Sequence, residues 1–153
     1  MKKVALLLML FTATVSFAQL KKVESTPKEV IGKAQQFGAP LEAECTKSGN
    51  VYTISYKDSQ YKQITEYASF SFEDKDNTFN DLYATIEEGF KTMPAEPIKL
   101  ELPNHFVWLQ FEKFLGGQVM RISSSSSKEG TALVTMSNQI AKKQVEKLFG
   151  KKK

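Results

Sequence analysis

The chain has 153 residues, with 21 basic residues, 17 acidic ones, one cysteine and one histidine. A single cysteine excludes an intramolecular disulfide. One cysteine and one histidine are also too few to form a cluster of thiols or imidazoles that would bind a metal. The sequence also lacks a glycine-rich phosphate loop and a nucleophile elbow. We therefore expect no cofactor, no metal and no enzymatic activity.

Residues 1–18, MKKVALLLMLFTATVSFA, have the pattern of a bacterial secretory signal peptide. Two lysines precede an apolar stretch, and Ser16-Phe17-Ala18 fits a cleavage site. The apolar stretch is shorter than the roughly 20 residues that a membrane-spanning helix needs. The sequence predicts cleavage between Ala18 and Gln19, no transmembrane segment and a periplasmic or secreted product.

Residues 19–153 have the size of one domain, and we expect a single core. Two of the basic residues lie in the signal peptide, so the mature chain carries a net charge of only +2. Lysines gather near the C-terminus, but Glu146 interrupts them, as on a solvated helix face. This balance gives no support to nucleic-acid binding.

The first element after the signal peptide is predicted to be a helix over residues 26–37. Thr26-Pro27-Lys28-Glu29 has the form of a capping box with proline at the first helical position. Gly38 and Pro40 would end the helix. The expected apolar face comprises Val30, Ile31, Ala34 and Phe37.

Residues 41–74 alternate in the manner of three antiparallel strands, with turns at 48–50 and 57–60. The second turn leaves two registers open. A two-residue loop pairs Tyr56 with Tyr61, and a three-residue loop pairs Ile54 with Ile64.

A second helix is indicated by apolar residues at helical spacing: Phe79, Leu82, Tyr83, Ile86 and Phe90. The aspartates at 74 and 76 resemble the start of a calcium loop. However, Phe79 stands where an EF-hand needs glycine. We attribute these carboxylates to stabilisation of the helix N-terminus.

Four strands are expected next, over residues 98–102, the two halves of a hairpin within 105–127, and 131–137. A closing helix is predicted over 138–149, ended by Gly150. The order is helix, three strands, helix, four strands, helix. We therefore predict an α+β fold in which helices pack on one antiparallel sheet of about seven strands.

The hairpin is predicted to turn at Gly116-Gly117, since glycine tolerates the positive φ of a type I′ turn. This register places Glu112 opposite Arg121, the only arginine in the chain. A three-residue turn at 128–130 would then place Val134 and Met136 on the core face. The rest of the predicted core face is Val107, Leu109, Phe111, Met120 and Ile122.

The opposite face of the hairpin is the candidate binding surface, with Trp108, Gln110, Glu112 and Arg121. Tryptophan offers a large rigid contact area with a polar handle, which suits recognition of a protein or a sugar. Tyr67 would extend this surface if its strand pairs alongside. Alternatively, one of the helices covers this face and makes Trp108 a core residue.

The sequence contains two possible catalytic pairs, Cys45 with His105 and Glu101 with Glu112. Cys45 and His105 lack any surrounding signature of a catalytic dyad, so we expect a buried thiol and a histidine in a surface turn. Glu101 and Glu112 are the pair that a glycosidase mechanism would require, but no pattern fixes their separation.

Three functions follow from these features. The leading hypothesis is an exported, non-enzymatic binding or interaction module. The alternative is a carrier that holds a small apolar ligand in a pocket between sheet and helix. The third is a small carboxylate-dependent hydrolase. The partner would be a protein, a glycan or a small apolar molecule.

Overall fold

The computed structural model describes residues 27–61, 64–129 and 132–152. The predicted signal peptide and its cleavage site lie outside these ranges. Within the described residues, no helix has the length and apolar character needed to cross a membrane.

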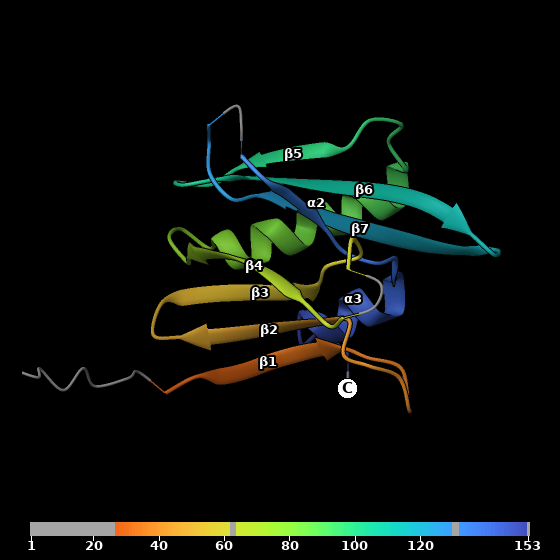
Figure 1. The fold of residues 1–153 in the computed structure, drawn as a ribbon, viewed down its shortest axis with the longest axis horizontal. Coiled ribbons are helices and arrows are strands. Elements are labelled where there is room, and N and C mark those ends of the chain that lie inside the picture. Colours follow the sequence, from red (N-terminus) through yellow and green to blue (C-terminus); the bar gives the residue numbers. More distant parts are fainter. Residues whose placement is uncertain (1–26, 62–63, 130–131, 153) are drawn as a thin grey trace, which may run out of the picture.

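The strands form two antiparallel sheets (Figure 1). The four-stranded sheet has the order β1 (Glu29–Ala34), β2 (Ala43–Ser48), β3 (Val51–Lys57) and β4 (Tyr67–Glu73). The five-stranded sheet contains β5 (Ile98–Glu101), β6 (Phe106–Phe114), β7 (Gly117–Ser125) and β8 (Val134–Met136), in that order. Its fifth strand, β9 (Ile140–Ala141), pairs with another part of β7.

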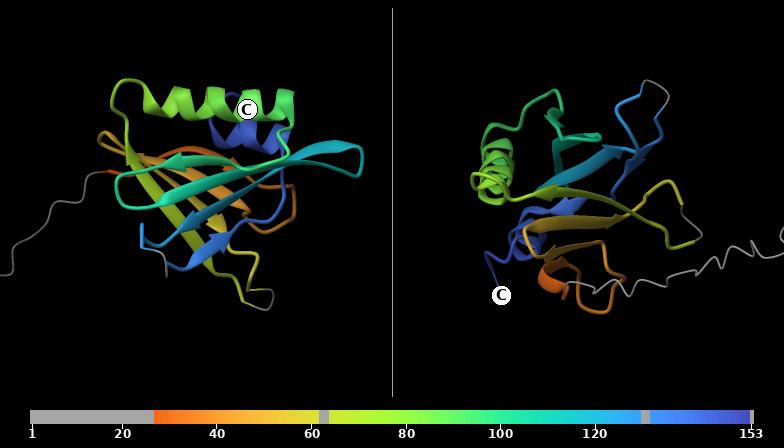
Figure 2. Two further views of the ribbon diagram at one scale, coloured as in Figure 1. Left: turned by 90° about the horizontal axis from the view of Figure 1, so that it is seen from above. Right: turned by 90° about the vertical axis from the view of Figure 1, so that its left-hand side faces the viewer.

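Both described helices lie on the same side of the strands (Figure 2). Helix α2 (Thr78–Thr92) connects the two sheets, and α3 (Lys142–Leu148) follows β9. The single core cluster combines α2 residues such as Phe79 and Ile86 with inward-facing residues of both sheets, such as Ile54 and Leu109. The helices therefore cover the inner faces of the sheets, and each sheet keeps an outer face.

The predicted fold class is wrong. Instead of one sheet of about seven strands with three helices, the described residues form sheets of four and five strands with two helices. The individual strands in 41–74 and 98–137 are confirmed. What the sequence pattern missed is that α2 separates them into two sheets.

The predicted first helix is wrong, because residues 29–34 form β1 at the edge of the four-stranded sheet. The β-branched pair Val30-Ile31 and the following glycine disfavour a helix. A Cβ atom at Gly32 would lie 1.9 Å from the backbone oxygen of Lys147 in α3. The strand thus packs directly on the C-terminal helix, and Phe37, expected in the core, is fully exposed.

The closing helix is shorter than predicted. It begins at Lys142 rather than near residue 138, because Ile140 pairs with Met120 and continues the sheet as β9. Gly150 follows the helix with a φ of 66°. The predicted role of Gly150 as a helix stop therefore agrees with the structure.

The hairpin turns one residue earlier than predicted. Phe114 pairs with Gly117, and the turn residues Leu115 and Gly116 have φ values of 48° and 78°. Glu112 consequently faces Val119 rather than Arg121. The register is shifted by two residues, which leaves every side chain on its predicted face. The predicted core face is confirmed, since all five of its hairpin residues are buried.

The predicted register of β7 with β8 is wrong by one residue, which reverses the faces of β8. Ser124 pairs with Thr135, so Val134 is exposed instead of buried. A long-range contact selects this register. The Tyr56 hydroxyl lies 2.6 Å from Ser124 Oγ and 2.8 Å from Thr135 Oγ1, and so joins the inner faces of the two sheets.

Neither predicted register connects β3 to β4. Lys57 pairs with Tyr67, so a long connection replaces the tight turn. The backbone N–H of Ser59 in this connection donates to the Met136 carbonyl, 2.7 Å away. The connection therefore reaches across to the second sheet, a contact that a local turn pattern cannot show.

Candidate functional site

The side of the five-stranded sheet that faces away from the helices, called here the outer face, carries four of the five predicted binding residues. Trp108, Gln110 and Glu112 come from β6, and Arg121 comes from the neighbouring β7. Tyr67 lies apart, in β4, whose only partner among the described strands is β3. Its hydroxyl donates to the Leu41 carbonyl at 3.0 Å. The structure therefore brings the first four residues together and leaves Tyr67 on the other sheet.

No described helix covers the outer face, because both pack on the opposite side. The Phe90 ring of α2 meets the Phe111 ring edge-on at 5.1 Å between centroids, with 78° between the ring planes. Gly89 lies against the same ring. On the outer face, Trp108 is half-buried and Gln110 is exposed. The alternative in which a helix makes Trp108 a core residue is thus excluded for the described part of the chain.

An aromatic pair with a cation occupies one end of the outer face. The rings of Phe106 and Trp108 lie 6.1 Å apart, and the Lys99 ammonium lies 3.8 Å from the Phe106 centroid and 5.8 Å from that of Trp108. Lys99 reaches this position because β5 pairs it with Trp108. The sequence interpretation did not include Lys99, since nothing local fixes the register of β5. Cation–π contacts of this kind hold the rings in place.

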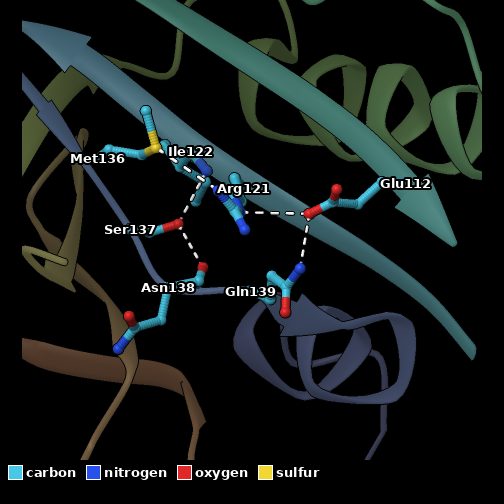
Figure 3. A network of polar contacts seen from close by, with 7 residues as sticks. All are labelled: Glu112, Arg121, Ile122, Met136, Ser137, Asn138 and Gln139. Carbon is cyan, nitrogen blue, oxygen red and sulfur yellow. Dashed lines mark hydrogen bonds and ion pairs between the residues drawn. The ribbon is translucent and has the colours of Figure 1, made fainter. Parts of the chain in front are cut away.

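The charge pair at the other end is diagonal rather than directly cross-strand. Arg121 Nε lies 3.2 Å from Glu112 Oε1, and about one third of each side chain is exposed. Gln139 also donates from Nε2 to Glu112 Oε1 at 2.7 Å (Figure 3). The Arg121 Nε–H makes no hydrogen bond within the described residues, so the contact to Glu112 is an ion pair only. A pair this exposed contributes little to stability and serves mainly to orient the guanidinium.

A polar cleft of about 650 Å³ opens beside Arg121. Its walls come from the β1–β2 connection, Ser59, β7, residues 137–139 and α3. Asn138 Nδ2 donates to Glu42 Oε2 at 2.8 Å and so ties two of these walls together. Ser137 fixes the segment on β7, because its hydroxyl accepts from the Ile122 N–H at 2.9 Å (Figure 3). Sequence patterns gave no sign of this cleft, since its residues are far apart in the chain.

Within the described residues, no three side chains of histidine, cysteine, aspartate or glutamate gather to hold a metal ion. No protein-family model, curated protein or solved structure matches the chain. The side chains themselves are therefore the basis for assigning a function.

Cys45 is fully buried, as predicted, and burial together with neighbouring Glu44 raises its pKa to about 12. A thiol held protonated is a poor nucleophile. His105 lies in the β5–β6 connection, as predicted, but is half-buried against the Phe70 ring. Burial, with Lys128 nearby, lowers its pKa. Neither group has the properties of a catalytic dyad.

The carboxylates of Glu101 and Glu112 do not form a glycosidase pair. Glu101 is opposite Phe106, six residues along β6 from Glu112, which corresponds to about 20 Å of strand. Glycosidases need their two carboxyl groups within roughly 10 Å. In addition, the Lys128 ammonium, 2.5 Å from Glu101, lowers the pKa of that carboxyl, whereas a general acid requires a raised one.

Two adjoining pockets offer apolar walls to a carrier. The first lies between α2, β4 and β5, next to Phe70, Leu82 and Leu100, and its volume is about 240 Å³. The second has a volume of about 590 Å³ and shares Phe72 and Leu102 with the first. Pockets for small organic ligands usually measure roughly 300–1,000 Å³. Of these two pockets, the second has this size, so it is the place where a carrier would hold its ligand.

Proposed function

We propose that this protein is an exported, non-enzymatic binding module of the bacterial periplasm or cell exterior, and that it binds its ligand on the outer face. One observation carries the proposal: both described helices pack on the inner side of the five-stranded sheet, so the face with Trp108 is open. The export part of the proposal rests on the pattern of residues 1–18 alone.

The side chains on this face are suited to recognition because their neighbours already restrain them. Lys99 packs over the Phe106 and Trp108 rings, and Gln139 and Arg121 hold Glu112. Groups restrained before binding lose less conformational entropy when a ligand arrives. Tryptophan and arginine are also the residue types that most often dominate binding energy. The outer face thus combines exposure with the chemistry of an interaction surface.

The binding proposal is tested with the protein beginning at Gln19, immobilised and exposed separately to the protein fraction and the polysaccharide fraction of the producing cell's envelope. We expect one fraction to be retained. Trp108→Ala should reduce this retention roughly tenfold or more, because truncation of a tryptophan that contacts the ligand removes a large part of the contact energy. Retention is measured by biolayer interferometry.

Tyr67→Ala is the matched control, because Tyr67 is an exposed aromatic residue on the other sheet. Circular dichroism should show that both variants keep the wild-type fold. Equal loss of retention in both variants, or retention of neither fraction by the wild type, would show that the outer face is not the binding surface.

A further inference from the structure

The polar cleft beside Arg121 has the size of a small-molecule site. Its volume of about 650 Å³ lies within the roughly 300–1,000 Å³ of such sites. Its side chains include Gln36, Glu42, Arg121, Asn138, Gln139 and Gln144. The described residues that line it include no aromatic residue and no large aliphatic one. A ligand here would be recognised through hydrogen bonds.

Three amide side chains in the cleft each make one hydrogen bond within the protein, through either the nitrogen or the oxygen of the amide. Asn138 Nδ2 donates to Glu42, and Gln139 Nε2 donates to Glu112. Gln144 Oε1 accepts from the Ala141 N–H at 3.0 Å, at the start of α3. Within the described residues, the other end of each amide makes no hydrogen bond, which leaves Asn138 Oδ1, Gln139 Oε1 and Gln144 Nε2 available. The cleft therefore presents fixed acceptors and a fixed donor.

The charges around the cleft nearly cancel. Among the described residues that line the cleft, Arg121 is the only basic side chain and Glu42 the only acidic one, and Glu112 lies against the guanidinium. This balance disfavours a strongly charged ligand. The carboxylates would repel an anionic ligand, and the guanidinium would repel a cationic one. A neutral ligand with many polar groups fits the cleft better.

We propose that the polar cleft binds a neutral saccharide. Each hydroxyl of a sugar both donates and accepts, so adjacent hydroxyls match a mixed set of amide oxygens, amide nitrogens and guanidinium N–H groups. A peptide would instead be expected to use a strand edge with pockets for apolar side chains, and the cleft provides no such pockets. The inference rests on the proposed binding function and names its ligand class, since Arg121 belongs to both the outer face and the cleft.

The test measures binding of maltotetraose, cellotetraose and di-N-acetylchitobiose by saturation-transfer NMR and isothermal calorimetry, with triglycine and glucuronic acid as comparison ligands. We expect at least one neutral saccharide to bind and neither comparison ligand to match it. Gln144→Glu should weaken this binding roughly threefold to tenfold, because the carboxylate still accepts from Ala141 but no longer donates to the ligand. Arg121→Lys should act similarly, since it keeps the charge and loses the guanidinium fork.

Lys143→Gln is the control for Gln144→Glu, because it changes the net charge equally, is exposed in the same turn and does not line the cleft. It should leave the affinity within about twofold. The inference is overturned if none of the three saccharides binds at about 10 mM, or if Lys143→Gln weakens binding as much as Gln144→Glu. In either case, loss of envelope retention by Trp108→Ala would still support the outer face as a binding surface. The saccharide proposal can therefore be wrong while the proposed binding function is right.

Discussion

Gly32→Ala is expected to destabilise the protein by about 3 kcal/mol or more, because an added Cβ atom would meet the backbone of α3. The new Cβ atom would lie 1.9 Å from the Lys147 carbonyl oxygen and 2.6 Å from that of Leu148. Both obstacles are backbone atoms of α3, which no change of rotamer removes. The substitution should therefore separate β1 from α3, and urea unfolding should show a lower midpoint.

Gly117→Ala is the matched control, because its Cβ atom would meet only one backbone oxygen, at an ordinary distance of 3.5 Å. Its backbone has no positive φ, so alanine should be neutral or slightly stabilising. If both substitutions gave the same unfolding midpoint, residues 29–34 would not form the strand that packs on α3, and the predicted N-terminal helix would have to be reconsidered.

Gly89→Ala is expected to destabilise the protein by about 1–3 kcal/mol, although alanine is the better helix former. The added Cβ atom would lie 2.2–2.3 Å from two ring atoms of Phe111. That ring is buried and also packs against Phe90, so it has little room to move. This contact is where α2 meets the inner side of the five-stranded sheet, and it fixes which side of that sheet remains open.

A double-mutant cycle with Phe111→Leu isolates this contact. Phe111→Leu alone should cost stability through the lost ring, but Gly89→Ala should cost much less in the Phe111→Leu background than in the wild type. Urea unfolding of the four proteins measures the coupling. Additive effects of the two substitutions would place Gly89 away from Phe111, and α2 would then not be docked as described.

The face on which a side chain lies was predicted correctly where the strand register was wrong by two residues, because side chains alternate with that period. The Gly116-Gly117 turn was misplaced, but the resulting two-residue shift returned Phe111 and Trp108 to their predicted sides. The one-residue error at β8 reversed Val134 instead. The decisive contact there is made by the Tyr56 hydroxyl, which comes from a different sheet and has no local signal.

Helix predictions succeeded where the apolar period was long and failed where only a capping signal supported them. Helix α2 has five apolar residues at regular spacing over three turns, and it is confirmed. The N-terminal segment had a capping box and a short apolar pattern, but pairing with β2 and close packing on α3 outweigh both. Such tertiary contacts routinely override local propensity.

The candidate site was predictable only in part. Trp108, Gln110, Glu112 and Arg121 share a face because one hairpin carries them, and alternation along two strands is enough to group them. The polar cleft draws Glu42, Arg121 and Gln144 from three distant segments, so no spacing in the sequence relates them. Lys99 was missed for the same reason.

The solvent accessibility of Trp108 shows whether the outer face is open, because Trp108 is the only tryptophan and lies on this face. Acrylamide quenching of its fluorescence is measured in the free protein and after addition of the envelope fraction that the protein retains. We expect efficient quenching in the free protein and clear protection in the bound one. A tryptophan already shielded in the free protein, or one equally quenched in both states, would contradict an open binding face.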